Sequence, residues 1–242
     1  MRLKIEIKAD KLPVAYRFGL LSMIKEAVSV SDSQYAEQLF NSHNRDMKPF
    51  AYSSYLKNFR FEGEDILLDS FSIIISSSDL NFMMMLYNGL VNRRKYRYKT
   101  YEWELGKIQM LPEKTVQSSS VLFRTLSPLL IESADQQPLA PNDPGYEREF
   151  NYYANLTVQL MLKRPLKKQL TVRPMQMKKM VIKENTHHIN GGNQVLYLTA
   201  YKGMIFVEGD PEDLDCLYKA GVSRRRSLGF GLLDIEMEGV RA

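Results

Sequence analysis

The sequence predicts an α+β protein made of two tandem ferredoxin-like (RRM-like) domains, and three observations support this prediction. The chain has 242 residues, which is enough for two small domains. Hydrophobic residues make up 44% and charged residues 25% of the chain, as in ordinary globular proteins. Elements in the order strand, helix, strand, strand, helix, strand are expected twice. We therefore expect one domain at residues 1–115 and a second at 116–242.

The first half contains one βαββαβ set and a short extra helix. Residues 2–8 alternate between apolar and charged side chains, which is typical of a half-buried strand. Pro13 is expected to start a helix, Asp32 or Ser33 to cap the short second helix, and Asp79 to cap the last helix. The six main elements are expected at residues 2–8, 14–28, 49–56, 66–76, 80–92 and 98–110, with a turn at 62–65.

The second half repeats this order. A loop with three prolines is expected at 135–145, and Asp210 followed by Pro211 is a strong helix start. The four strands are expected at 121–131, 170–183, 194–207 and 229–238, with one helix at 146–162, another after Asp210, and a hairpin turn near 190–193.

Composition excludes several classes of protein. The longest mostly apolar stretch, Phe82 to Val91, is far shorter than the roughly 20 residues that cross a bilayer. The N-terminus lacks the apolar core of a signal peptide. Cys216 is the only cysteine, so the chain can form no internal disulfide. We therefore expect a cytoplasmic protein with no membrane partner.

Positive charge is clustered along the chain. The net charge is only +5, from 33 Lys and Arg against 28 Asp and Glu. However, residues 93–99 hold five basic residues, residues 163–183 hold eight and no acid, and Arg224, Arg225 and Arg226 are consecutive. Such clustering favours a polyanionic partner. The residues expected to contact it are Arg93, Arg94, Lys163, Arg164, Lys167, Lys168, Arg173 and the glycine-rich loop described next.

The glycine-rich loop at residues 221–231 joins the last predicted helix to the last strand. Glycines allow positive φ angles and close approach of a ligand to the backbone. Successive backbone amides in such a loop can hold a phosphate, and arginines bind phosphates in a bidentate manner. The alternative is a tight connection whose glycines only turn the chain. Because three arginines lie within the loop, we expect a polyanion site at Gly221, Ser223, Arg224, Arg225, Arg226, Gly229 and Gly231.

This loop resembles the signature loop of the RAMP superfamily of RNA-processing proteins. The pattern is Gly-hydrophobic-Gly, five residues, and Gly-hydrophobic-Gly; here it reads Gly221-Val222-Ser223, then 224–228, then Gly229-Phe230-Gly231, with Ser223 replacing one glycine. Along nearly its whole length the chain is similar to the CRISPR-associated endoribonucleases that cut repeat RNA. The resemblance implies metal-independent cleavage, without a cofactor, of precursor transcripts into guide RNAs. The ribose 2′-hydroxyl would attack the adjacent phosphate, leaving 2′,3′-cyclic phosphate and 5′-hydroxyl ends.

The resemblance also implies catalytic residues. His43 follows the second short helix, where the family has its catalytic histidine, and an imidazole with a pKa near 6.5 suits proton transfer at neutral pH. Lys48 lies where members often carry a cation that stabilises the phosphorane charge. Some members have a tyrosine on the first helix, and this chain has Lys25 there. Tyr35, on the second helix, is a further candidate to assist His43.

Two other functions remain open from the residues. The chain could be a noncatalytic RNA-binding subunit of the same superfamily, or a DNA-binding regulator with paired ferredoxin-like domains. His43 and Lys48 favour the enzyme, and no carboxylate or cysteine lies at metal-ligand spacing from His187 and His188. The expected partner is CRISPR repeat RNA, and the sequence leaves open both a multi-subunit interference complex and a homodimer.

Overall fold

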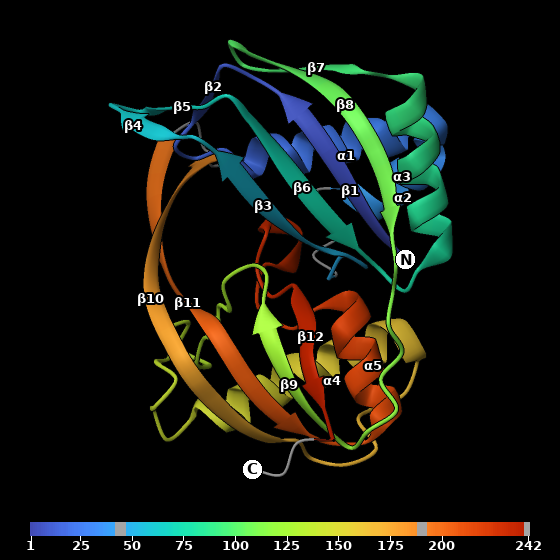
Figure 1. Cartoon of the computed structure of the whole chain (residues 1–242), viewed down its shortest axis with the longest axis vertical. Coiled ribbons are helices and arrows are strands. Elements are labelled where there is room, and N and C mark those ends of the chain that lie inside the picture. The colour runs from blue at the N-terminus through green and yellow to red at the C-terminus, as the bar shows by residue number, and fades with distance from the viewer. Residues whose placement is uncertain (42–46, 188–192, 240–242) are drawn as a thin grey trace.

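The computed structural model describes residues 1–41, 47–187 and 193–239. It contains a five-stranded sheet in one half of the chain and a four-stranded sheet in the other, and both are antiparallel. Helices pack on one face of each sheet (Figure 1). The first hydrophobic core draws on residues from Leu3 to Leu105 and the second on residues from Val116 to Ile235. The predicted tandem ferredoxin-like fold is confirmed, and the boundary at residue 115 stays a prediction.

The N-terminal sheet has the strand order β3-β6-β1-β8-β7. Its first four strands form the ferredoxin-like set, and β7 extends the edge beside β8. The elements are β1 (Arg2–Lys8), β2 (Lys11–Pro13), α1 (Arg17–Ser31), α2 (Ser33–Phe40), β3 (Ala51–Lys57), β4 (Arg60–Glu62), β5 (Asp65–Leu67), β6 (Ser70–Ser76), α3 (Leu80–Asn92), β7 (Lys95–Tyr98) and β8 (Tyr101–Leu111).

The C-terminal sheet has the order β10-β11-β9-β12, which is the same topology. Its β10–β11 hairpin is much longer than the other strand pairs and curves up beside the N-terminal domain (Figure 1). The elements are β9 (Ser120–Thr125), α4 (Tyr146–Leu162), β10 (Thr171–His187), β11 (Asn193–Glu208), α5 (Pro211–Ala220), the 3₁₀ turn η1 (Arg226–Leu228) and β12 (Leu233–Glu238).

Several expected boundaries are wrong, because tertiary pairing changed them. The first helix begins at Arg17 and not at Val14, because residues 11–13 pair with β5 as the short strand β2. The turn at Gly63 belongs to a separate small hairpin, β4–β5, and does not join the two long strands directly. The strand expected at 121–131 ends at Thr125. The expected caps are confirmed, since Asp32, Asp79 and Asp210 each accept a backbone N–H at their helix starts.

The distal half of the β10–β11 hairpin packs against the N-terminal domain. Ile182 and Leu198 from the hairpin share a small core with Phe230, and Phe18 and Leu21 of α1 pack against it. Polar contacts reinforce this packing: Lys183 Nζ lies 2.7 Å from a carboxylate oxygen of Glu64, and Arg17 Nη1 lies 3.5 Å from Glu184 Oε1. The hairpin therefore joins the two domains.

A second contact between the domains lies at the start of the chain. Arg2 is buried and its Nη2 atom donates to the carbonyl oxygens of Tyr218 and Leu233, at 2.6 Å each.

No helix in the described part of the chain is long and apolar enough to cross a membrane.

Candidate functional site

The glycine-rich loop packs against strand β3. Gly221, Gly229 and Gly231 all have φ between +74° and +77°, a region that side chains with a Cβ rarely adopt. A Cβ atom at Gly229 would lie 2.7 Å from Cε2 of Tyr52, and one at Gly221 would lie 2.8 Å from Cβ of Ala51. These glycines therefore let the C-terminal loop approach the N-terminal sheet closely.

Much of the loop's backbone is bonded within the protein. The amide of Val222 donates to the Gly231 carbonyl at 2.9 Å, and that of Arg224 donates to the Leu130 carbonyl at 2.9 Å. The Gly231 amide donates to Pro128, and the buried Ser223 hydroxyl accepts from the Leu130 amide at 2.9 Å. The amides of Gly221, Gly229 and Gly231 therefore already have protein acceptors, whereas the assignment of the loop, Ser223 included, as an RNA-binding site stays a prediction.

The three consecutive arginines have different environments. Arg224 pairs with the buried Glu132, and its Nη2 atom donates to Gln136 Oε1 at 3.3 Å. Arg225 is half-buried, and burial lowers the pKa of its guanidinium, as does the neighbouring Arg224 charge. Arg226 is only 1% exposed, and burial lowers its pKa to about 10. Arg226 cannot contact RNA from this position, so its assignment as an RNA-binding residue is corrected to a structural role.

Arg226 connects the glycine-rich loop to the segment that carries the candidate catalytic residues. Its Nη1 atom donates to the Ala220 carbonyl, and its Nη2 atom donates to the Lys48 carbonyl oxygen at 3.1 Å. The backbone of Lys48 is thus fixed by a residue 178 positions away. His43 lies outside the described residues.

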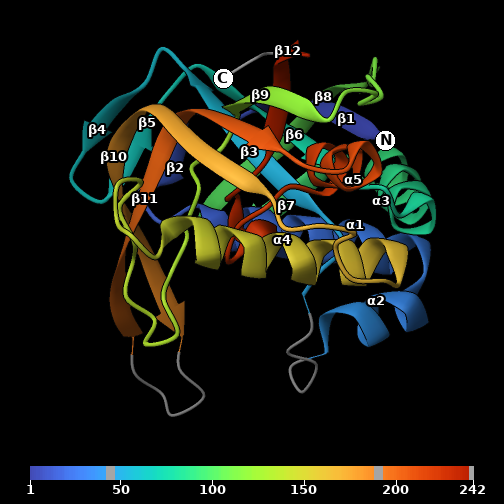
Figure 2. The same ribbon diagram turned by 90° about the horizontal axis from the view of Figure 1, so that it is seen from below.

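A pocket of about 410 Å³ lies beside Lys48, between the two domains. Met47 and Pro49, the two neighbours of Lys48, line it, together with residues of α2 and of the C-terminal end of α4. These two helices lie side by side in Figure 2. Lys163, just after α4, also lines the pocket, so the structure brings this predicted RNA-binding residue close to the Lys48 segment.

The two candidates to assist His43 lie on different sides of α2. Tyr35 lines the 410 Å³ pocket, and burial raises the pKa of its phenol to about 12. Lys25 is exposed on α1 and lines a separate pocket of about 320 Å³ with Phe40 and Asn41. Asn41 is the last described residue before the segment that contains His43.

The basic segment 163–183 is partly neutralised in three dimensions. Arg164 pairs with Glu212 and the buried Asp213, at 2.8 and 2.6 Å. Lys167 Nζ lies 3.2 Å from Asp210 and 2.7 Å from Glu212. The same acids cap and begin α5, as expected from the sequence. Apart from Lys163 and the paired Lys167, the exposed basic residues of the segment are Lys168, Arg173, Lys178 and Lys179.

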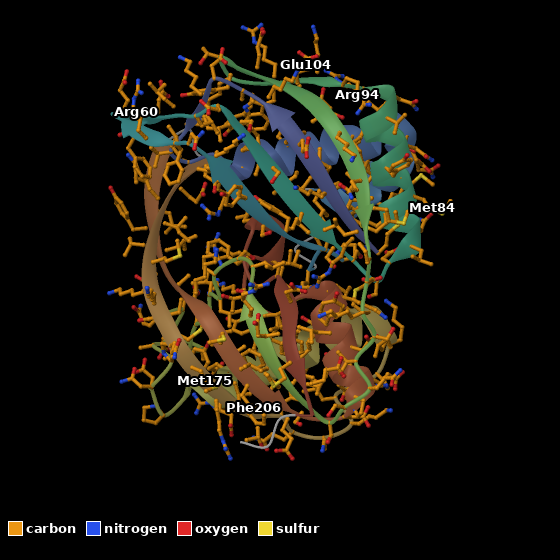
Figure 3. All side chains as sticks on the ribbon, viewed as in Figure 1. Arg60, Met84, Arg94, Glu104, Met175 and Phe206 are labelled. Atoms are coloured by element: carbon orange, nitrogen blue, oxygen red, sulfur yellow. The ribbon has the colours of Figure 1, made fainter. Side chains whose placement is uncertain are left out.

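Arg93 and Arg94 lie away from the glycine-rich loop. They precede β7, which is the edge strand of the N-terminal sheet opposite β3, whereas the loop packs on β3 (Figure 3, where Arg94 is labelled). Arg93 Nη2 also lies 2.6 Å from Glu26 Oε1. The expectation that one path includes residues 93–99 and the loop is therefore not supported by their placement.

Sequence reasoning missed the acidic partners of these basic residues. Glu132 and Glu184 are buried and face Arg224 and Arg17, from 92 and 167 positions away. The Arg17 charge opposes the effect of burial on Glu184, but burial dominates and raises the pKa of this carboxyl to about 7. No local pattern marked either residue, because both lie in segments that are otherwise typical of strands or loops.

Comparison with known families identifies the chain. The family model described as "CRISPR associated protein Cas6, C-terminal" matches residues 111–235, which is more than half of the chain. The chain belongs to the Cas6 family. Cas6 proteins are RAMP-superfamily proteins that act in the processing of CRISPR repeat RNA, so this is the general function of the chain.

Solved structures support the fold of this Cas6 protein. A Cas6-related protein from Pyrococcus furiosus has a TM-score of 0.80 and 18% identity, with 99% of each chain covered. A RAMP protein described as binding different RNA substrates has a TM-score of 0.79 and 17% identity, covering 98% of this chain and 100% of that one. A Cas6 product complex has a TM-score of 0.71 and 13% identity, covering 97% and 98%. Comparison with curated protein sequences gives no match.

Proposed function

We propose that this Cas6 chain is an active, metal-independent endoribonuclease that binds CRISPR repeat RNA and cuts precursor transcripts into guide RNAs. The observation that supports it best is the hydrogen bond from Arg226 to the Lys48 carbonyl. Through this bond the family's glycine-rich loop holds the segment that carries the catalytic candidates, at the edge of a pocket between the domains. The loop thus acts by positioning the site.

The proposed reaction transfers a phosphoryl group within the RNA. The 2′-oxygen loses its proton and bonds to the adjacent phosphorus, and the bond from phosphorus to the 5′-oxygen breaks as that oxygen gains a proton. His43 is proposed to carry out proton transfer, because the imidazole pKa lies near neutral pH. Lys48 is proposed to stabilise the negative charge of the phosphorane. Lys25 lies on α1, exposed at the side of α2 opposite Tyr35, and is a candidate for a second cation.

The RNA is proposed to reach this site across the exposed basic residues. Lys163 lines the pocket, Lys168 follows it in the connection to β10, and Arg173 lies on β10. Backbone phosphates bind such residues without base specificity, so these contacts would position the RNA and not read its sequence. We propose that a multi-subunit interference complex receives the guide RNA that this cleavage produces.

The deciding experiment is incubation of the protein with repeat RNA in EDTA, followed by mapping of the ends. We expect cleavage, with 2′,3′-cyclic phosphate and 5′-hydroxyl products. A single deoxyribose immediately 5′ of the scissile phosphate should abolish cleavage and preserve binding, because it removes the nucleophile. Cleavage of the deoxy substrate, or a strict requirement for a divalent ion, would contradict the mechanism. Binding without cleavage of either RNA would indicate a noncatalytic RNA-binding subunit.

Substitutions test the catalytic roles proposed for His43 and Lys48. His43→Ala should slow single-turnover cleavage by about 10²–10⁴-fold with little change in RNA affinity, as for a general acid or base. Lys48→Ala should also slow the chemical step. Lys95→Ala is the matched control, since Lys95 is exposed on the far edge strand β7. An unchanged rate in His43→Ala would remove that residue from the mechanism.

A further inference from the structure

The β4–β5 hairpin exposes two phenylalanine rings that contact each other. Phe59 and Phe61 are 49% and 66% exposed. Their ring centroids lie 5.8 Å apart and the ring planes are perpendicular, so the edge of one ring meets the face of the other. The hairpin lies at the edge of the molecule in Figure 1, and Arg60, which separates the two phenylalanines in the sequence, is labelled there in Figure 3. Neither ring belongs to a hydrophobic core of the described residues.

The hairpin is anchored to the domain, so the two rings are held in place. Strand β5 is the middle strand of a three-stranded sheet, with β2 on one side and β4 on the other. Leu12 of β2 lies opposite Ile66 of β5, and both are buried in the N-terminal core. Phe61 lies opposite Ile66 on the other side of β5, and all three residues of β4 are exposed. A fixed aromatic surface of this kind loses little conformational entropy when a ligand binds to it.

The unpaired charges around the two rings are mostly positive. Lys57 and Arg60 are exposed, and neither has an acidic partner among the described residues. Of the three acids in the hairpin, Glu64 and Asp65 each pair with a lysine, at 2.7 and 3.8 Å, which leaves Glu62. The surroundings of the rings therefore favour a ligand that carries negative charge.

The hairpin also lies beside strand β10, which carries a further exposed lysine. The contact of Glu64 with Lys183 joins the two elements. Lys179 lies four residues before Lys183 on the same face of β10, about 13 Å away, and is exposed. Exposed aromatic side chains next to a row of cations are typical of sites for single-stranded nucleic acid.

We propose that Phe59 and Phe61 form a stacking site for unpaired bases of the RNA, and that Lys57 and Arg60 contact the adjoining phosphates. Stacking uses the π-face that every base has, so the site accepts any base. A protein partner is less favoured, because a standard interface needs about 800 Å² on each partner, whereas the apolar surface here is confined to two rings among charged residues. The site rests on the proposed RNA binding and does not depend on cleavage.

Binding is measured with single-stranded repeat RNA that carries a deoxyribose 5′ of the scissile phosphate, so that the RNA stays uncut. Phe61→Ala and Phe61→Leu should each weaken binding about 5- to 100-fold, whereas Phe61→Tyr should bind like the wild type, because only tyrosine keeps an aromatic face. Loss of the ring should leave the slope of log affinity against log salt unchanged, and Arg60→Ala should reduce that slope by about one. Tyr152→Ala is the matched control, because Tyr152 is 54% exposed on helix α4 of the other domain.

Tryptophan fluorescence gives a second measurement, which reports on stacking directly. Trp103 is the only native tryptophan and is 1% exposed, so a ligand on the surface cannot stack on it. Adding the RNA should quench the emission of Phe61→Trp, because a base stacks on the new indole, and should not quench that of Tyr152→Trp.

The outcomes separate this site from the proposed catalysis. Unchanged affinity in Phe61→Ala, full affinity in Phe61→Leu, or no quenching in Phe61→Trp would each overturn the stacking site. Failure of the wild-type protein to bind RNA would overturn both proposals. Weaker binding by Phe61→Ala, together with no cleavage of the all-ribose RNA by the wild type, would refute the catalysis and leave the stacking site in place.

Discussion

The glycine-rich loop and strand β10 have a similar density of basic residues, but the side chains of these residues lie in different environments. In the loop, Arg226 is buried against backbone carbonyls and Arg224 pairs with Glu132. In the first half of β10, Arg173, Lys178 and Lys179 are exposed. A basic cluster in a sequence therefore forms a positive surface only where the fold brings no acid or carbonyl against it.

Strand β10 shows the same contrast along its own length. Its first half forms the edge of the C-terminal sheet, where side chains can extend into solvent. Its distal half packs on the N-terminal domain, with Ile182 and Glu184 buried and Lys183 paired with Glu64. The charges of the first half are therefore available to a polyanion, and those of the distal half serve the contact between the domains.

The largest expected effect is on stability, from Arg226→Ala. We expect the free energy of unfolding to fall by about 3–5 kcal/mol, because the change leaves a cavity and removes the guanidinium that donates to the Ala220 and Lys48 carbonyls. Chemical denaturation measures this, with Arg173→Ala as an exposed control that should change it by less than about 0.5 kcal/mol. A stable Arg226→Ala protein that had lost RNA affinity would instead restore the loop as a phosphate site.

A pH dependence should follow from Glu184 in the distal half of β10. Burial raises the pKa of this carboxyl to about 7 in the folded protein, above its ordinary value near 4.5, so the folded state holds the proton more tightly. Stability should therefore fall as the pH rises from about 5 to 8, by about 2–3 kcal/mol. Glu184→Gln should remove this component, whereas Glu104→Gln, on the exposed surface, should follow the wild type. Equal pH profiles for wild type and Glu184→Gln would contradict the raised pKa.

Two glycines with similar backbone angles should respond differently to alanine. Gly229 has φ +76° and a Cβ atom there would lie 2.7 Å from the Tyr52 ring, whereas a Cβ atom at Gly63, with φ +62°, would meet no atom within 4 Å. Both changes strain the backbone by about 1 kcal/mol, and only Gly229→Ala also displaces a neighbour, so we expect an additional loss of about 2 kcal/mol there. Thermal or urea unfolding measures both. Equal losses would mean that the loop does not need close contact with β3.

The smallest expected effect compares two adjacent lysines. Lys167 pairs with Asp210 and Glu212, whereas the exposed Lys168 has no acidic partner among the described residues. If Lys168 contacts a phosphate, Lys168→Ala should reduce the slope of log affinity against log salt by about one, and Lys167→Ala by less than half of that. Filter binding over a range of salt concentrations measures the slopes. A larger change for Lys167→Ala would reverse the assignment.

Local signals predicted the elements well, but long-range pairing moved their ends. The helix Tyr146–Leu162 has the predicted bounds, because its apolar spacing and the following Pro165 are local features. The first helix was predicted three residues too early, because nothing near Pro13 reveals that residues 11–13 pair with β5. For the site, His43 and Lys48 could be proposed from their positions after α2. The bond from Arg226 to Lys48 could not, because it joins residues 178 positions apart.

Local sequence signals are sufficient to predict the duplicated βαββαβ order, the helix caps and the glycine pattern of the family, because propensity, periodicity and capping depend on neighbouring residues. Which arginines face solvent depends instead on the tertiary fold. That choice depends on acids and carbonyls brought from distant segments, such as Glu132 beside Arg224 and Lys48 beside Arg226. Burial in a low-dielectric interior makes a charge costly unless such partners surround it, so the fold, and not the local count of basic residues, sets where a polyanion can bind.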